Sequence, residues 1–330
     1  MKYQSELLEL WKNRLPDTKE AAKVLSETLH VSLDSAYRRL RGDTALSFDE
    51  GMQLMQHAGL SNGALTGGQS THIAFQRLGA IDNLDRLREI YSENDGHISA
   101  LRQEDGHMLY MAKDIPIFYN FLFGQIGGFK SFVWAKSLYN FSDEQQEVYS
   151  EGSAPEPLLQ AGQQMALNYQ KLSSTEFWTD STISSVLKQL KYYYEMGAIK
   201  TQRLALSILD DVRKQVDLVI EQAKLGQKIN PATGEPIPGT SFKLYYHELL
   251  VMDNSVLGLT EDRKLYFAPY SGLNYLSTVD QNYCGEIEKW AHDQMDNSIL
   301  LSKSSSKERV KFHRRLHQQI DSLYEYIKYF

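Results

Sequence analysis

The stretch Val31–Gly42, with the sequence VSLDSAYRRLRG, constrains the fold of this chain more than any other segment. Ser32 belongs to the residue types that cap helix N-termini, and Gly42 is typical of the left-handed residue that ends a helix. Between these two positions apolar residues recur at helical spacing and three arginines lie among them. The pattern predicts a short capped helix with a basic exposed side.

A second short helix precedes this one and runs to about residue 29. Its expected core residues are Ala21, Val24, Leu25 and Leu29. His30 and Val31 are then left for the turn. In the capped helix itself, the residues at core spacing are Leu33, Ala36 or Tyr37, and Leu40. Two short helices joined by a tight turn are how a helix-turn-helix protein presents a recognition helix to DNA.

Further helices are expected on both sides of this pair. Residues 3–14 have apolar side chains at helical spacing, and Ser47 is placed to cap another helix that continues to Gly59. The glycine-rich and polar stretch Ser61–Ser70 is the clearest linker. The sequence therefore predicts a compact helical domain over residues 1–66.

These first 61 residues resemble the lambda-repressor/Cro-like helix-turn-helix family. The resemblance rests on the spacing of Ala21–Leu25, Val31–Ser32, Ala36, Arg41–Gly42, Leu46–Glu50 and Leu54–Ser61. It implies a five-helix DNA-binding domain that is often dimeric. Thr28–His30 replaces the usual turn that contains alanine or glycine, which predicts a looser turn. The whole chain resembles long bacterial regulators in which such a domain precedes a large C-terminal region.

The helix-turn-helix interpretation identifies a set of DNA-binding residues. Polar residues near the start of a recognition helix reach base edges, and arginine can bind guanine bidentately or hold a phosphate. The candidates are Ser32, Asp34, Ser35 and Arg38 for bases, with Arg38, Arg39, Arg41 and Lys23 for phosphates. Six acidic residues accompany them between residues 20 and 50, so one copy is expected to bind modestly and dimerisation to be needed.

Bulk composition limits the class of protein. The chain has 330 residues with 42% hydrophobic content, which is enough for a sizeable core and favours two or three domains. Its net charge of -7 argues against a protein that coats nucleic acid, but it is compatible with a small DNA-reading module. Mean hydropathy is -0.44, and neither a membrane-length apolar run nor a signal-peptide pattern is found. These features predict a cytoplasmic protein with no membrane partner.

The remaining chain predicts a mainly α fold with a smaller α/β C-terminal part. Residues 67–96 are expected to form a linker and a connector helix that ends at Asn94–Gly96. Residues 97–330 are expected to be an effector and dimerisation region, helical to about residue 226 and α/β from about residue 240. Strands are expected at His107–Lys113, Phe242–Met252 and Lys264–Tyr270.

The other motifs in the sequence do not indicate a metal, catalytic or phosphate-binding site. His313 and His317 have the spacing of a metal pair on a helix, but neighbouring basic residues disfavour a cation. His247–Glu248 lacks the second histidine of a metalloprotease motif, and Gly124–Gly128 lacks the Lys-Ser/Thr pair of a phosphate loop. Cys284 is the single cysteine, so no intrachain disulfide can form, and a buried thiol is the expected state.

The sequence therefore predicts a sequence-specific transcriptional regulator that binds double-stranded DNA as a homodimer. Its C-terminal region would sense a small molecule or a protein effector, and no metal, cofactor or enzymatic activity is expected. Two alternatives stay open. The helical domain could dock a protein instead of DNA, or the C-terminal region could house an enzyme, although no catalytic constellation supports the enzyme.

Overall fold

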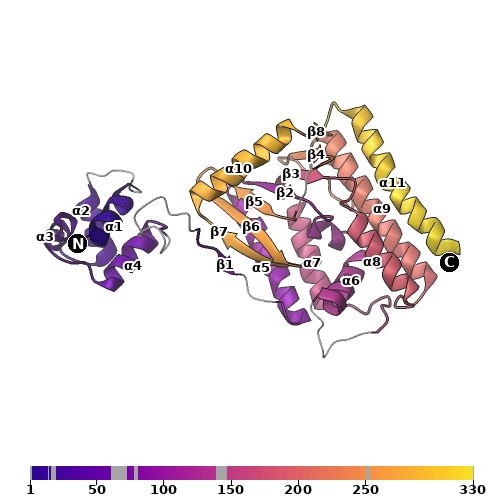
Figure 1. The fold of residues 1–330 in the computed structure, drawn as a ribbon, viewed down its shortest axis with the longest axis horizontal. Helices are drawn as coiled ribbons and strands as arrows, with labels where there is room; N and C mark the ends of the chain where they lie inside the picture. Colours follow the sequence, from indigo (N-terminus) through magenta and orange to yellow (C-terminus); the bar gives the residue numbers. More distant parts are fainter. Residues whose placement is uncertain are drawn as a thin grey trace. The chain divides into compact units, whose positions relative to one another are not determined.

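The computed structural model describes residues 2–13, 15, 20–60, 73–77, 81–138, 147–249 and 253–329. The chain divides into two compact units, residues 1–75 (unit 1) and residues 76–330 (unit 2) (Figure 1). In the described residues, unit 1 contains helices and no strand, whereas unit 2 is built around one sheet. The expected linker at Ser61–Ser70 lies outside the described residues.

Unit 1 is a small helical bundle. Its α-helices are α1 (Lys2–Lys12), α2 (Ala21–Leu29), α3 (Leu33–Arg41) and α4 (Phe48–His57). Every one of them contributes to a single apolar cluster, whose fully buried members include Trp11, Leu25, Ala36 and Leu54. Four of the five expected helices are therefore present in the part of unit 1 that the structure describes.

Local sequence signals set the ends of α3 and α4 as expected. The Ser32 hydroxyl accepts a hydrogen bond from the Ser35 amide at 3.3 Å, and Gly42 ends α3 with a left-handed φ of 84°. At α4, Ser47 and Glu50 form a reciprocal capping box. Both predicted N-caps and the predicted glycine stop are confirmed.

The turn between α2 and α3 is tight, not loose as its sequence predicted. His30 adopts the left-handed conformation that glycine usually supplies, with φ 52°. The Val31 amide donates to the Ser26 carbonyl at 3.1 Å, and the Ser26 hydroxyl donates to the Val31 carbonyl at 2.6 Å. These two bonds close the turn without an alanine or glycine.

The buried face of α3 is narrower than its apolar residues suggested. Ala36 is fully buried and Leu40 packs partly against the core, as expected. Leu33 and Tyr37, however, are 48% and 49% exposed, so the expected core position of Leu33 is wrong. The small Ala36 side chain lets α2 approach closely, and only a thin strip of α3 is then covered.

Unit 2 contains an eight-stranded mixed sheet in the order β1-β7-β6-β5-β2-β3-β4-β8 (Figure 1). The strands are β1 (Gln76–Arg77), β2 (His107–Met111), β3 (Ser173–Trp178), β4 (Phe242–Tyr246), β5 (Val256–Leu259), β6 (Lys264–Ser271), β7 (Asn274–Thr278) and β8 (Ile299–Leu300). β2, β3 and β4 are parallel neighbours, and every other pairing is antiparallel. The parallel strands require helical crossovers, which the chain supplies.

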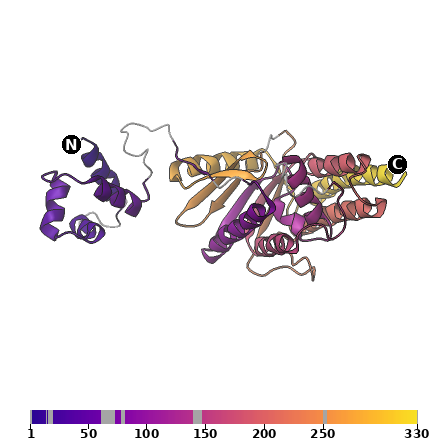
Figure 2. The ribbon, with the colours of Figure 1, turned by 90° about the horizontal axis from the view of Figure 1, so that it is seen from below.

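The helices of unit 2 cover both faces of this sheet. They are α5 (Leu84–Gln103), the 3₁₀ helix η3 (Ile117–Phe121), α6 (Ile126–Val133), the π-helix η4 (Trp134–Leu138), α7 (Glu156–Tyr169), α8 (Ser184–Glu195), α9 (Gln202–Leu225), α10 (Gln281–Asp296) and α11 (Ser306–Tyr329). Two neighbouring residues of β6 contact helices on different faces of the sheet. Phe267 contacts His97 of α5, whereas Tyr266 contacts Tyr283 of α10. Because successive strand residues point to opposite faces, α5 and α10 lie on opposite faces (Figure 2).

Two sequence predictions about this region are corrected. The expected change from helical to α/β structure near residue 226 does not occur, because β2 and β3 lie at the centre of the same sheet as β4. The helix expected to end at Asn94–Gly96 continues to Gln103. Ile98 and Leu101 are buried beyond that point, so packing outweighs the turn-forming residues. The expected connector helix is thus part of the core of unit 2.

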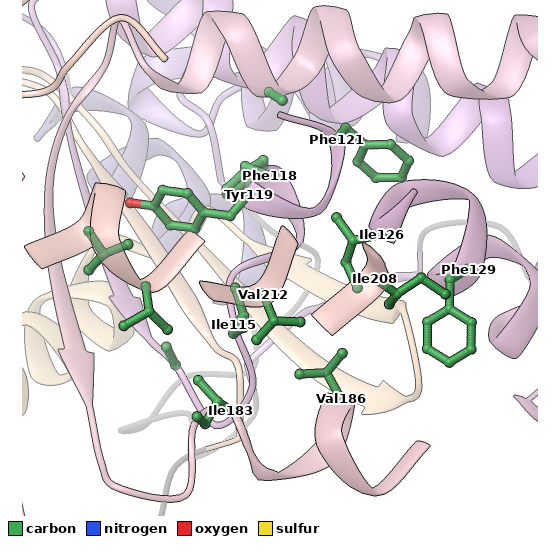
Figure 3. Packing of buried hydrophobic residues seen from close by; sticks show 14 of the residues in the cluster. Ile115, Phe118, Tyr119, Phe121, Ile126, Phe129, Ile183, Val186, Ile208 and Val212 are labelled. Carbon is green, nitrogen blue, oxygen red and sulfur yellow. The ribbon is translucent and has the colours of Figure 1, made fainter. Parts of the chain in front are cut away.

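Aromatic and branched side chains fill the space between the sheet and the larger helical layer. Figure 3 shows part of this cluster, where Ile126 and Phe129 of α6 lie near Ile208 of α9 and Val186 of α8. Gly162 of α7 faces the ring of Phe121, which a Cβ atom at this position would strike. The close approach of α7 to η3 therefore depends on glycine.

A charged residue lies at the centre of the sheet. Glu176 of β3 is fully buried and accepts hydrogen bonds from the hydroxyls of Tyr119 and Tyr169 at 2.7 and 2.6 Å and from the Trp178 indole at 2.8 Å. The Lys228 ammonium, also fully buried, lies 3.5 Å from the Glu176 carboxylate and 3.9 Å from the Tyr169 ring centre. Burial lowers the pKa of Lys228 to about 8, although Glu176 acts in the opposite direction. The partners of this carboxylate thus come from η3, α7, β3 and the segment after α9.

His107 at the start of β2 gives a testable pH dependence. Burial, assisted by the charges of Lys243 and Lys228, lowers the pKa of His107 from 6.5 to about 4. Below about pH 6.5 the unfolded chain therefore binds a proton at His107, whereas the folded chain binds it only near pH 4. The free energy of unfolding consequently decreases as the pH falls from about 6.5 to 4. The shift corresponds to a loss of about 3 kcal/mol.

The measurement is the free energy of unfolding between pH 7 and 4 for the unmodified protein and for His107→Gln. The variant should lose less stability over this interval, and His292→Gln, at an exposed position of α10, serves as the matched control. Parallel stability curves for the unmodified protein and His107→Gln would contradict the assignment.

Candidate functional site

The exposed face of α3 is the first candidate site. Residues 33, 37 and 41, and likewise 34, 38 and 41, are spaced by three or four, so the five positions share one side of the helix. Arg38 pairs with Asp34 at 2.9 Å and Arg41 pairs with Asp43 at 2.9 Å, and all four side chains are more than half exposed. Exposed pairs of this kind contribute at most about 1 kcal/mol, so both arginines can exchange their partners for a ligand.

Arg39 has a different place from the one its sequence position predicted. Its guanidinium donates to the Glu50 carboxylate, with Nη2 to Oε1 at 2.6 Å and Nε to Oε2 at 3.3 Å. The two side chains are only 13% and 19% exposed. Arg39 also donates to the hydroxyl of half-buried Ser35. Arg39 is therefore paired within unit 1 instead of fully exposed, and its contact with a DNA phosphate stays a prediction.

Glu50 and Gln4 together fix the position of α3. Glu50 binds Arg39 while accepting from the Ser47 amide at 2.9 Å, which ties α3 to the start of α4. Arg39 also lowers the pKa of the Glu50 carboxyl through this hydrogen bond. Gln4 of α1 donates to the Thr44 carbonyl at 2.9 Å and accepts from the Leu46 amide at 3.1 Å. The loop after α3 is thus held from both sides.

The other predicted DNA-binding residues are accessible. Ser32, Asp34, Arg38 and Arg41 are exposed around α3, and Lys23 is exposed on α2. Tyr37 lies on the same face of α3 as Arg38 and Arg41, and the sequence interpretation placed it among the candidate core residues. Its spacing of four residues from Leu33 had indicated a core position, but Tyr37 is 49% exposed.

The second candidate site is a cavity in unit 2, under α5 and against the sheet. Its volume is about 270 Å³, and its walls come from α5, β2, η3, α6, η4, α8, β5, β6 and β7 and from the loops beside them. Val256 and Gly258 line it from one face of β5, and Asn254, with a left-handed φ of 72°, lines it from just before that strand. Gly258 leaves room for Leu101 of α5, which a Cβ atom would meet at 3.0 Å.

The polar groups of this cavity gather beyond the carboxyl ends of β2 and β3. Asp114 follows β2 and accepts from the Asn254 amide group at 3.2 Å, while Ser185 and Gln189 belong to α8, which follows β3. Lys130 of α6 donates to Gln189 at 2.7 Å. Crevices at the carboxyl ends of parallel strands are a common location for ligands.

Lys130 is an unusual member of this lining. Its residue is 7% exposed, and its ammonium lies 5.2 Å from the Trp134 ring centre. No carboxylate of the described residues forms an ion pair with it, and its hydrogen-bond acceptor is a neutral amide. Burial lowers the pKa of Lys130 to about 8, with Asp114 acting in the opposite direction. The sequence contains a signal for it, a single lysine within the otherwise uncharged stretch Ile126–Val133.

A third cluster combines Asp217 of α9 with His313 and His317 of α11. Their ligand atoms lie within 4.8 Å of one another, so the structure adds a carboxylate to the histidine pair seen in the sequence. Both Nε2 atoms lie 2.7 Å from Asp217 Oδ1. Arg213 donates to His317 Nδ1 at 3.2 Å, which keeps the proton of neutral His317 on Nε2. A metal needs that nitrogen unprotonated, so hydrogen bonding between α9 and α11 accounts for this cluster better than a metal site.

Two other motifs have structural roles. At Gly124–Gly128, the Asp211 carboxylate accepts from the Gln125 and Ile126 amides at 2.5 and 3.3 Å, so it occupies the place of an anion at the start of α6. Cys284 is buried in α10, and burial raises the pKa of its thiol to about 11. Neither motif offers a site for a ligand or for nucleophilic chemistry.

Comparison with models of protein families, with curated proteins and with solved structures finds no match for this chain. Among the described residues, no helix is both long and apolar enough to cross a membrane.

The contrast between Arg39 and Arg41 gives a direct test of the first site. Glu50→Gln leaves Arg39 mostly buried without its counter-charge and should destabilise unit 1 by about 2–3 kcal/mol. Asp43→Asn removes the exposed partner of Arg41 and should cost less than about 1 kcal/mol. Amide hydrogen exchange of α3 and α4 in the full chain measures both values. Equal effects of the two substitutions would show that Glu50 does not anchor α3.

Proposed function

We propose that this chain is a sequence-specific DNA-binding transcription regulator in which α3 is the recognition helix. The observation that carries the proposal is a helix held on one side by Glu50 and Gln4 that presents Tyr37, Arg38 and Arg41 on the other. In this proposal unit 1 belongs to the lambda-repressor/Cro-like class and unit 2 senses an effector.

Energetics favour DNA contact by Arg38 and Arg41. The major groove admits one helix, and an arginine that binds guanine bidentately contributes about 1–3 kcal/mol of discrimination. Release of Arg38 from Asp34 costs no more than about 1 kcal/mol, because both side chains are exposed. The contact of Arg38 with guanine would therefore contribute favourably to the free energy of DNA binding. Arg41 and Lys23 would then hold phosphates.

Acidic residues weaken the DNA affinity expected of a single copy of unit 1. Asp34 and Asp43 accompany the two exposed arginines, so phosphate attraction at this face is weak. Two copies of unit 1 on half-sites one turn of DNA apart would multiply a modest affinity. We propose that the protein acts as a homodimer and that an effector bound to unit 2 changes the spacing of the two recognition helices.

The test is a selection from random-sequence DNA with the full chain, followed by affinity measurements on the selected site. Arg38→Ala should weaken binding by about 10–100-fold and relax one base position. Arg88→Ala is the matched control, because Arg88 forms a comparable exposed ion pair with Asp85 on α5. Failure to enrich any sequence, or equal effects of the two substitutions, would refute the proposal.

Exposed apolar side chains favour a second candidate, a protein-docking adaptor. Phe48 and Met52 lie four residues apart on α4 and are 82% and 39% exposed, and Leu33 and Tyr37 are exposed on α3. A salt series separates the candidates, since DNA affinity falls steeply with salt and apolar docking does not. Phe48→Ser should leave DNA binding within about twofold if α3 is the recognition helix, and should abolish partner capture if α4 is a docking face.

A further inference from the structure

We propose that the cavity of unit 2 binds a small amphipathic carboxylic acid, with its carboxylate on Lys130 and its apolar body between α5 and the sheet. This inference rests on the proposed role of unit 2 as the effector-sensing part of a regulator. It gives that effector a chemical class.

Lys130 carries a buried positive charge with no ion-pair partner among the described residues. Lys130 is 7% exposed, and its hydrogen bond goes to the neutral amide of Gln189. In the described chain, the other buried lysine of this layer, Lys228, has Glu176 at 3.5 Å and the rings of Tyr169 and Phe242 around it. Burial of a cation is costly unless a counter-charge accompanies it. A ligand carboxylate would supply at Lys130 what Glu176 supplies at Lys228.

The remaining polar groups suit a carboxylate at the same end. Ser185 and Gln189 line the cavity on α8, and a hydroxyl and an amide can each donate a hydrogen bond to a carboxylate oxygen. Asp114 is held by Asn254, whose amide group donates to it at 3.2 Å and whose carbonyl oxygen accepts from the Asp114 backbone amide at 2.9 Å. The neighbouring acid is thus partnered within the protein, and Lys130 remains available to a ligand.

The rest of the cavity fits an apolar body. Ile90, Ile98 and Leu101 of α5 face Met108, Val256 and Phe267 of the sheet across it. Val256 and Gly258 of β5 line one wall of this apolar part, about 7 Å apart along the strand. Leu101 of α5 packs against Gly258 there. The volume of about 270 Å³ lies near the lower end of the range for ligand pockets, so it suits a small acid such as octanoate.

The experiment measures binding by the full chain in the absence of DNA, with isothermal titration calorimetry at pH 7. The probes are octanoate, 1-octanol and octylamine, which share one chain and differ in the head group, and 4-phenylbutyrate, which replaces the alkyl chain by a ring. Octanoate should bind at least about tenfold more tightly than 1-octanol, as a charge-assisted hydrogen bond requires. The ratio of octanoate to 4-phenylbutyrate affinity distinguishes a fatty acid from an aromatic acid.

The variant Lys130→Met should remove the preference for the acid and leave 1-octanol binding within about twofold. It should also raise the melting temperature of the unliganded protein, because a buried charge without a counter-charge is removed. Lys136→Met is the matched control, since Lys136 lies six residues further on, outside the cavity lining. Octanoate should keep its tenfold advantage in this control.

Equal affinities for octanoate and 1-octanol, tighter binding of octylamine, or no binding of any probe would each overturn the inference. The comparison of probes on the unmodified protein is decisive even if Lys130→Met fails to fold. Because no DNA is present, a chain that binds octanoate but enriches no DNA sequence would refute the proposed function and retain this site.

Discussion

The balance of buried charge is the constraint on which unit 2 depends. Glu176 lies in β3, the middle one of the three parallel strands, and accepts hydrogen bonds from Tyr119, Tyr169 and Trp178, with Lys228 as its counter-charge. These donors come from η3, α7, β3 and the segment after α9. A carboxylate without them would carry a large desolvation cost, so the elements around the sheet must meet at this point. Against that background, the unbalanced Lys130 marks the cavity as a site for an anion.

In unit 1, a mostly buried carboxylate and its partners likewise fix the positions of neighbouring helices. Glu50 receives the guanidinium of Arg39 and the amide of Ser47, and these contacts set the angle between α3 and α4. Two neighbouring arginines thus have different roles. Arg39 is mostly buried and holds the fold, whereas Arg38 is exposed and free to exchange Asp34 for DNA. The burial of its ion pair, and not the residue type, therefore distinguishes the arginine that stabilises the fold from the arginine proposed to contact DNA.

Local signals made part of this fold predictable from the sequence. The caps at Ser32 and Ser47 and the stop at Gly42 depend on residues within one turn of helix, and all three are found where they were expected. The exposure of Leu33 and Tyr37 was not predictable, because it depends on how closely α2 approaches Ala36. The role of Arg39 depends on Glu50, which lies eleven residues away on the next helix.

The sheet was predicted only where single strands are apolar. The sequence indicated β2, β4 and β6, but β3 has the sequence SSTEFW and gives no apolar alternation. Its polar side chains are buried because partners such as Tyr119 arrive from more than fifty residues away. The cavity could not be predicted for the same reason, since its walls come from nine helices and strands. Only the lone lysine in Ile126–Val133 pointed to it.

The most direct test of the central claim is the amide hydrogen exchange of the full chain with and without its selected DNA. The account predicts slower exchange in α3 and in the turn that precedes it, with α1 and the sheet of unit 2 unchanged. Protection confined to α4 around Phe48, or to unit 2, would contradict the assignment of α3 as the recognition helix.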